Sequence, residues 1–580
     1  MSNIKRNLRA LLTLILTLAI MVSMLSGCGG SSKTSDPTGS ADTTANTTAS
    51  GSAASASPDV PGSDIDTSSP YGKYKEPIEL SVFSLDFKNP TTEYDSSNPE
   101  RKSASENMWI NAYSDYLNIK VNRIIAEDGT ALNATINTSM ASGSLPDVMV
   151  VPKTMFYVLA ENDVCADLKE SYKTYIESYG KLLAKCVATS PDALTKGTVG
   201  GKLLGFPTVT ASFNATEVLW IRQDWLDKVG KKLPTTIDEM IDIARAFKKA
   251  KLGGDKTIGL GMNFTTESGK EAVSFSSILA PYGVVMNTWQ KDGAGKYAFT
   301  NTMDAMKDGL LKLQEIYRDG IIKSDFAVTN TLKEEVANGL VGMYYGSSTE
   351  GVVKVKANLL NDPNAKWTCC RIPTQNGEAV RQWTNSSITE FIVVNKKYKH
   401  PEAIFKMLEL EMHMCKEASA EETAKYYMCK DGYPAWYLRV FKNFDQADNP
   451  LVLGKLIIEG LAKNAKEISP VANSAYQNVL GGLAGDRAKE GYILVYTVAR
   501  PILLDMLEKD KNCLVASYDG PITENISLYQ STINEALTNA MLEVIMGADI
   551  SVFEKAVKTW YATGGQTITD DVNNYYKSME

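Results

Sequence analysis

The sequence predicts an α/β fold, and three observations support that prediction. Segments with the pattern of a strand, a helix, a strand, a helix and a strand follow one another between residues 78 and 151. Beyond Pro207, long stretches have the 3.6-residue apolar period of amphipathic helices. Hydrophobic residues make up 44% of the 580 residues, which is enough for a large core. We therefore expect mixed sheets flanked by helices.

The first elements can be placed from their apolar spacing. The segment IELSVFSL alternates apolar and polar residues, as a half-buried strand does. The apolar run DVMVV is typical of a buried parallel strand, because both faces of such a strand are covered. In order, we expect a strand at Ile78–Leu85, a polar loop at 86–98, a helix at 104–117, a strand at 119–125, a helix near 131–142 and a strand at 147–151.

The second half of the chain is richer in helices. The clearest helix starts at Thr236, because a threonine favours the first position and Asp238 and Glu239 lie near the positive end of the helix dipole. Residues 303–317 and 401–414 have a similar period, and 391–395 form a strand-like run before the last of these helices. No internal repeat of fixed length is visible.

The N-terminus has the pattern of an export signal. Three basic residues precede an apolar stretch at 10–25, which is shorter than the roughly 20 apolar residues that a membrane span needs. The run LSGC, which ends at Cys28, resembles the lipobox of bacterial lipoproteins. The resemblance implies that residues 1–27 are removed and that Cys28 carries lipid, with durable anchoring by two or more acyl chains. The alternative is an ordinary cleaved signal followed by a cysteine without this role.

A linker is expected to follow the signal. Residues 29 to about 70 are almost entirely Gly, Ser, Thr, Ala, Asp and Pro, and with Cys28 we place the linker at 28–75. Such a composition buries too little apolar surface to offset the entropy lost on ordering. About 40 residues of flexible coil have a root-mean-square length of roughly 35 Å, which would hold the globular part away from the membrane.

Charge and residue counts argue against several classes of function. Asp and Glu outnumber Lys and Arg by 68 to 60, for a formal net charge of −8, so we expect no nucleic-acid partner. Two histidines, His400 and His413, give little support to histidine catalysis or a histidine-rich metal site. Seven cysteines besides Cys28 form an odd set without CxxC spacing. Buried free thiols and a disulfide framework both stay open.

Several motifs occur in a fixed order along the chain. They are GSLPDVMV at 143–150, GKLLGFP at 201–207, LWIRQDWL at 219–226, LPTT at 233–236, AFK at 246–248, a helix and turn at 309–326, a strand at 339–346, IMG at 545–547, and Trp560 followed by Gly564 and Gly565. They resemble the motifs of the extracellular solute-binding proteins of family 1, most specifically at 219–248. The resemblance covers about 78–580 and is weakest between about 415 and 520. There the chain is longer than simple sugar binders and is more similar to the large oligosaccharide-binding lipoproteins of Gram-positive bacteria.

The resemblance implies a two-lobed, periplasmic-binding-protein-like fold of type II with a cleft at the hinge. The N-terminal lobe would comprise 76–209 and about 390–431, and the C-terminal lobe about 210–389 and 432–580. An oligosaccharide would bind by hinge closure and pass to the permease of an ABC transporter, without catalysis. We expect a monomer that is lipid-anchored on the extracytoplasmic face of the cell membrane.

Binding residues are expected on loops at the carboxyl ends of strands and at the hinge, where ligands of α/β lobes bind. Sugars call for aromatic faces together with hydrogen-bonding groups. The candidates are Asp86, Lys153, Thr154, Thr208, Thr210, Asn214, Glu217, Tyr345, Ser347, Trp383, Trp436 and Tyr529. Tyr529 is implied by the resemblance, because the family often carries an aromatic residue at this place. Trp220, Trp225 and Asp147 are expected to serve packing and strand-end capping instead.

Other functions stay open. A cell-surface polysaccharide-degrading enzyme could use paired carboxylates, although no acidic cluster lies in a recognisable catalytic motif. A sensor, or a binding protein for peptides or other solutes, could use the same scaffold because a fold does not fix its ligand. At Asp292 the spaced carboxylates of a calcium loop are missing, so we expect a β-turn there. We expect no metal and no cofactor.

Overall fold

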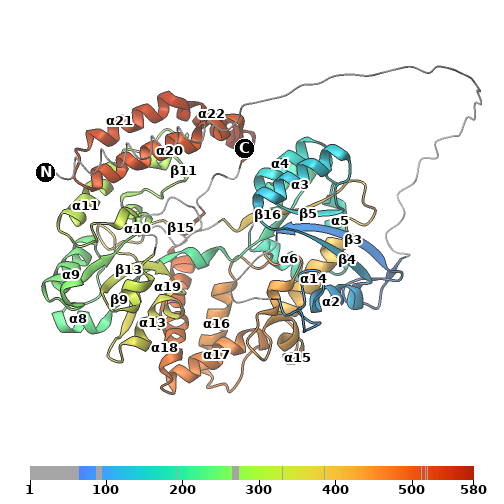
Figure 1. Cartoon of the computed structure of the whole chain (residues 1–580), viewed down its shortest axis with the longest axis horizontal. Helices are drawn as coiled ribbons and strands as arrows, with labels where there is room; N and C mark the ends of the chain where they lie inside the picture. Colours follow the sequence, from blue (N-terminus) through green and yellow to red (C-terminus); the bar gives the residue numbers. More distant parts are fainter. Residues whose placement is uncertain are drawn as a thin grey trace, which may run out of the picture. The chain divides into compact units, whose positions relative to one another are not determined.

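Two separate sheets organise the chain, one of five strands and one of four (Figure 1). The computed structural model describes residues 64–85, 94–190, 192–263, 274–328, 331–384, 386–510, 513–515, 518 and 520–579. The predicted signal, most of the predicted linker, the proposed lipid site at Cys28 and the candidate Asp86 lie outside the described residues.

The five-stranded sheet is mixed and has the order β4-β3-β5-β16-β8. Its strands are β3 (Ile78–Leu85), β4 (Ile119–Ala126), β5 (Val148–Pro152), β8 (Phe206–Val209) and β16 (Ile388–Val394). β3 pairs in parallel with β4 and β5, whereas β16 runs antiparallel to β5 and β8. The predicted parallel strand at 147–151 is therefore confirmed as β5. The helices of this part are α2 (Met108–Leu117), α3 (Gly129–Ser142), α4 (Lys153–Glu161), α5 (Lys169–Ser178), α6 (Lys181–Ala188), α7 (Ala193–Lys196), α14 (Ala403–Lys416) and α15 (Ala420–Glu422).

Capping residues fix where the first helix starts and ends. The Asn107 side chain accepts from the N–H groups of Trp109 and Ile110, and Asn118 ends the helix in the left-handed region at φ 57°. Helix α2 therefore starts at Met108, four residues later than predicted, because Asn107 supplies the N-cap that the apolar period alone does not locate.

A short hairpin of β1 (Ile65–Asp66) and β2 (Lys73–Tyr74) lies within the predicted linker. The rings of Tyr71 and Tyr74 are buried against the first core, and the Tyr74 hydroxyl donates to Glu402 Oε1 at 2.6 Å. Lys406 Nζ, also buried, donates to the Gly72 carbonyl at 2.5 Å. The linker boundary at residue 75 is therefore wrong, because two aromatic side chains supply the apolar area that residues 29–70 lack.

The four-stranded sheet is also mixed and has the order β10-β13-β9-β14. Its strands are β9 (Glu217–Arg222), β10 (Ile258–Gly261), β13 (Val341–Ser347) and β14 (Trp367–Cys370). β10 and β13 are parallel, and β9 runs antiparallel to β13 and β14. The helices around this sheet are α8 (Gln223–Val229), α9 (Ile237–Lys249), α10 (Ser274–Leu279), α11 (Met306–Arg318), α12 (Lys333–Ala337) and α13 (Lys354–Asn361).

Two local predictions are confirmed in this part. Helix α9 starts with a capping box, in which the Thr236 hydroxyl accepts from the Glu239 N–H and the Glu239 carboxylate accepts from the Thr236 N–H. Strands β11 (Trp289–Lys291) and β12 (Tyr297–Phe299) form a hairpin. Its turn contains the Gly295 N–H bond to the Asp292 carbonyl at 3.0 Å, as the β-turn prediction requires.

Each sheet has its own apolar core. The core of the first sheet is built from residues within 71–209 and 388–447. The cores of the second sheet are built from residues within 218–372, 451–506 and 526–572. The chain therefore passes between the cores three times, at 210–217, 373–387 and 448–450. We call these segments the three crossings.

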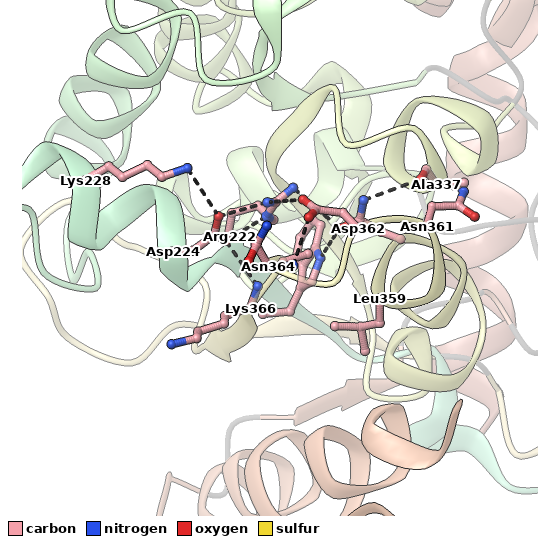
Figure 2. A network of polar contacts seen from close by, with 12 residues as sticks. Arg222, Asp224, Lys228, Ala337, Leu359, Asn361, Asp362, Asn364 and Lys366 are labelled. Atoms are coloured by element: carbon pink, nitrogen blue, oxygen red, sulfur yellow. Dashed lines mark hydrogen bonds and ion pairs between the residues drawn. The ribbon is translucent and has the colours of Figure 1, made fainter. Parts of the chain in front are cut away.

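The motif residue Arg222 lies in a buried polar network (Figure 2). Its guanidinium donates to both carboxylate oxygens of Asp224, at 2.8 and 2.9 Å, and to Asp362 Oδ2 at 3.2 Å. Asp224 also accepts from the Lys366 N–H, so the network joins the first turn of α8 to the loop before β14. The guanidinium lies over the Trp225 ring, 5.0 Å from its centroid. These contacts give the Arg and Asp of the motif LWIRQDWL a role in the fold.

Helices dominate the C-terminal part. They are α16 (Asn449–Ala462), α17 (Pro470–Leu483), α18 (Glu490–Ile493), α19 (Arg500–Asp505), α20 (Glu524–Ile545), α21 (Ser551–Trp560) and α22 (Gln566–Met579). Arg487 joins the segment between α17 and α18 to α13 and the loop before β14, because its guanidinium donates to the carbonyls of Leu359, Asp362 and Ala365. Among the described helices, none combines the length and apolar character of a membrane span.

The cysteines whose side chains the structure describes are free thiols. They are Cys165, Cys186, Cys369, Cys370, Cys415 and Cys429. Four of them are buried, and burial raises the pKa of the Cys165 thiol to about 12. Of the two interpretations left open by the sequence, buried free thiols therefore hold for the described side chains.

Candidate functional site

The strands of the first sheet bring polar groups together at one end. β3 and β5 are parallel, so their carboxyl ends share this end. The antiparallel pairings place the carboxyl end of β8 and the start of β16 there too, since Val209 pairs with Ile388 and Pro152 with Glu390. The strand-end site, as we call it, consists of Ser84, Lys153, Thr208, Thr210, Ser387 and Glu390.

An irregular segment borders this site. Residues 435–444, which we call the strap, begin with a 3-10 turn, η9 (Ala435–Leu438). Four strap residues, 440–443, line a small pocket together with Ser84, Leu85, Val150, Thr208 and Glu390. Asn443 Nδ2 donates to Glu390 Oε2 at 2.7 Å, and Lys442 Nζ donates to the Leu85 carbonyl at 3.3 Å. The pocket has room for about one water molecule or one hydroxyl group.

Two of the three crossings are hydrogen-bonded to each other at this end of the sheet, and the third starts three residues after Asp445, which is bonded to the same end. The Thr210 N–H donates to the Ser387 carbonyl at 2.7 Å, which joins the first and second crossings. The Thr384 hydroxyl donates to the Ser212 carbonyl at 2.8 Å and joins them again. Beside the third crossing, the Asp445 N–H donates to the Val209 carbonyl at 2.6 Å. All connections between the two cores therefore meet next to the strand-end site.

The structure places four predicted site residues at these strand ends. Lys153 starts α4, and its ammonium donates to the Tyr518 carbonyl at 2.9 Å and lies 5.3 Å from the centre of the Tyr518 ring. Thr154 follows on the same helix and is exposed. The hydroxyls of Thr208 and Thr210 donate to the carbonyls of Glu390 and Ser387, at 3.0 and 3.3 Å. Asn214 lies on the first crossing, in the 3-10 turn η2 (Ser212–Ala215), and its side chain is not among those described.

Two of the three candidates on the second sheet, Glu217 and Tyr345, are buried, and Ser347 is half-buried. Glu217 and Ser347 pair across β9 and β13, and the Ser347 carbonyl accepts from Trp220 Nε1 at 2.9 Å. Tyr345 is 3% exposed and its hydroxyl donates to the Met240 sulfur, so this side chain is part of the core.

Glu217 has a buried carboxyl group, and only one of its two oxygens accepts a hydrogen bond from a described residue. The Ser277 hydroxyl donates to Oε2, and Oε1 has no hydrogen-bond partner among the described residues. Burial raises the pKa of Glu217 to about 7, and the nearby Glu350 carboxylate adds to the rise. Glu350 is itself paired with Lys354 at 3.1 Å.

The aromatic candidates are spread over several elements. Trp383 lies in strand β15 (Gln382–Thr384), which pairs with β17 (Cys513–Val515), and its side chain is not among those described. Trp436 lies on the strap, where its ring stacks on Tyr437 with 3.7 Å between centroids. Tyr529 is on α20, half-buried, and packs against Gly564, since a Cβ added there would lie 2.4 Å from the Tyr529 ring.

Three residues predicted to have structural roles do have them. Trp220 and Trp225 are 0% and 1% exposed. Asp147 Oδ2 accepts from both the N–H and the hydroxyl of Ser81, at 2.8 and 2.6 Å, and so ties the entry of β5 to β3.

Sequence reasoning missed two polar residues of the small pocket, Glu390 of the site and Asn443 of the strap. Glu390 was placed just before the predicted return strand, but only its antiparallel register with β5 shows which end of the sheet it reaches. Asn443 lies where the motifs are weakest, and no local pattern marks the strap. The signal that could have found Glu390 is an acid inside an otherwise apolar strand, ITEFIVV.

A larger pocket, of about 280 Å³, lies beside the second sheet. Six of its thirteen lining residues are apolar, Leu233, Pro234, Ile372, Ala379, Val380 and Met506; the others are Thr235, Cys370, Arg371, Thr374, Gly377, Glu378 and Gln382. The described lining contains no aromatic ring on which a sugar could stack.

Comparison with known proteins decides the family. The family model described as bacterial extracellular solute-binding protein matches residues 109–427, more than half of the chain. The chain belongs to this family. The match confirms the resemblance seen in the motifs and identifies a solute-binding protein that binds rather than catalyses. The strap lies just beyond the matched residues.

Relatives and solved structures agree with this family. The chain is 26% identical to the polygalacturonan/rhamnogalacturonan-binding protein YtcQ of Bacillus subtilis over 227 residues, 37% of this chain and 42% of YtcQ. It is 24% identical to the lipoprotein LipO of the same species over 476 residues, 78% of this chain and 85% of LipO. The fold is similar to that of the Streptococcus pneumoniae ABC-transporter substrate-binding protein FusA in complex with kestose, with a TM-score of 0.52, 15% identity, and coverage of 87% of this chain and 100% of FusA. The YtcQ alignment spans less than half of that relative.

Proposed function

We propose that this solute-binding protein captures an oligosaccharide at the strand-end site and delivers it to an ABC transporter permease. The observation that carries the proposal is the meeting of the three crossings beside this site, between two sheets with separate cores. A few such connecting residues can absorb the dihedral changes of hinge closure around a ligand. The first lobe would comprise 64–209 and 388–447, and the remaining described residues the second.

A sugar suits the groups at this site. Thr208, Glu390 and Asn443 offer hydroxyl, carboxylate and amide groups, which together can donate to and accept from sugar hydroxyls. The strap also carries the stacked pair Trp436 and Tyr437, a surface for the C–H face of a sugar. The descriptions of YtcQ and FusA, which name polygalacturonan and rhamnogalacturonan for YtcQ and a kestose complex for FusA, support the same class of ligand.

We also infer that the mature protein is anchored through lipid on Cys28, on the extracytoplasmic face of the membrane. The run LSGC at 25–28 supports this, and so does the name of LipO, a lipoprotein similar to 78% of the chain. A two-chain anchor with a linker of this composition would keep the binding site accessible to solutes while staying near the permease.

Isothermal titration calorimetry tests the proposed ligand class. The panel is trigalacturonate, xylotriose, mannotriose, kestose and a mixture of short peptides. We expect binding to at least one sugar with no product formed on overnight incubation. Thr208→Val, which removes a hydroxyl from the pocket, is expected to weaken that binding about tenfold. Thr138→Val, which removes a hydroxyl from the exposed face of α3, serves as control. Binding to peptides alone, or cleavage of a sugar, would overturn the proposal.

A further inference from the structure

The strap, residues 435–444, is held in place by side chains of the surrounding elements. Trp109 Nε1, on α2, donates to the Ala435 carbonyl at 3.0 Å. Arg123 Nη1, on β4, donates to the Leu438 carbonyl at 3.4 Å. An irregular segment has few hydrogen bonds of its own, so its backbone conformation depends on such partners.

The centre of this anchoring is Glu411 on α14, which is completely buried. Glu411 Oε1 accepts from the Tyr113 hydroxyl at 2.6 Å and from the Phe441 N–H at 3.2 Å. The Tyr113 hydroxyl in turn accepts from the Val440 N–H at 3.1 Å. The two residues thus fix two successive strap amides. Burial raises the pKa of Glu411, so the group is costly to keep in the core and needs these partners.

Arg439 balances the charge of Glu411 from within the strap. Its Nη1 lies 3.9 Å from Glu411 Oε2, and its side chain is 4% exposed. The other guanidinium contacts are to strap carbonyls, from Nη2 to Lys442 at 2.9 Å and from Nε to Trp436 at 3.0 Å. Glu411 therefore holds the strap from α14, and Arg439 holds it through bonds within the strap itself.

The anchored part of the strap positions two side chains, those of Lys442 and Asn443, at the strand-end site. The anchored amides of Val440 and Phe441 come directly before Lys442 and Asn443, whose side chains contact Leu85 and Glu390. The small pocket is bounded by strap residues on one side and by strand ends on the other. A hydroxyl group fits its size and can both donate to the Glu390 carboxylate and accept from the Asn443 amide.

We propose that the strap is a specificity element of the binding site: it presents Asn443 to a hydroxyl group of the ligand, and Glu411 is its positioning residue. This inference rests on the proposed function, because it assigns a hydroxyl-bearing ligand to the same site. The inference assigns a binding role to the strap, which lies outside the residues that the family model matches. Relatives with a different segment in place of the strap would then select other ligands.

A matched pair of buried carboxylates on one helix tests this inference. Glu411→Met removes the oxygen that accepts from the Phe441 N–H and the Tyr113 hydroxyl, and Glu411→Gln restores one carbonyl oxygen. Glu409, two residues away and 5% exposed, accepts instead from the N–H groups of Leu182 and Leu183 at the start of α6. Glu409→Met is therefore a control for loss of a buried acid that does not touch the strap. Asn443→Ala tests the contact itself without disturbing the core.

The test measures sugar binding by each variant by calorimetry with the same panel of sugars. It also measures amide hydrogen exchange of each variant without ligand. Glu411→Met and Asn443→Ala are expected to weaken binding about tenfold, Glu411→Gln to restore most of it, and Glu409→Met to stay within about twofold of wild type. Exchange should quicken at Val440 and Phe441 in Glu411→Met and at Leu182 and Leu183 in Glu409→Met. Unchanged binding by Asn443→Ala overturns the inference, even if Glu411→Met fails to fold. A wild-type protein that binds no panel sugar overturns the proposed function, and this inference with it.

Discussion

Replacing Arg222 with alanine is expected to lower the free energy of unfolding by about 3–5 kcal/mol, which is typical for removing one partner of a buried ion pair. Arg222 is 2% exposed, and its loss leaves the Asp224 carboxylate, 12% exposed, without its bidentate partner. The contact with the Trp225 ring is lost as well. Urea denaturation followed by circular dichroism measures the change.

Lys228→Ala is the matched control for this prediction. Its ammonium reaches the same Asp224 carboxylate, at 3.9 Å, but its side chain is 59% exposed (Figure 2). A solvent-exposed pair of this kind contributes about 0–1 kcal/mol. If Lys228→Ala and Arg222→Ala lowered the free energy of unfolding equally, burial would not set the strength of this network. Arg222 would then not have the structural role assigned to it.

Replacing Glu217 with glutamine is expected to change how stability depends on pH. The pKa of Glu217 is raised from 4.5 to about 7 in the folded protein. The folded state therefore binds more protons than the unfolded state between these values, so the contribution of Glu217 is fully present below pH 4.5 and is lost as the pH rises through about 7. One pKa unit corresponds to about 1.4 kcal/mol, so wild type should lose about 3 kcal/mol relative to Glu217→Gln between pH 4.5 and 8.

Urea titrations of both proteins at pH 4.5, 6 and 8 provide the comparison. The difference between the two unfolding free energies, rather than either value alone, isolates this group from the other titrating residues. A difference that stays constant across the three pH values would show that Glu217 titrates normally, with water or another donor at Oε1.

Much of the fold was predictable because local patterns agreed with tertiary structure. The alternation in Ile78–Leu85 gave a strand with the predicted ends, and the threonine and acids at the start of α9 gave a capping box. The predicted start of α2 at residue 104 was wrong, because Asn107 caps the helix only in an extended backbone conformation, which the sequence alone does not show. The linker boundary was wrong because the burial of Tyr71 and Tyr74 depends on α14, which is more than 300 residues away in sequence.

The site was only partly predictable. Lys153 could be placed because a residue that follows a predicted strand lies at that strand's end, and Thr208 because it directly follows the motif GKLLGFP. Tyr345 shows the limit of that rule, since the last residues of β13 alternate between faces and the Tyr345 side chain packs against Met240. Glu390 and Asn443 depend on a strand register and on buried partners of the strap, neither of which leaves a local signal.

The central claim is that the solute binds at the strand-end site, beside the three crossings. Hydrogen exchange of the wild-type protein, with and without the panel sugar that binds in calorimetry, tests it most directly. We predict slower exchange on binding at 208–212, 386–390 and 440–444. Protection confined to other parts of the chain, with these three segments unchanged, would contradict the claim.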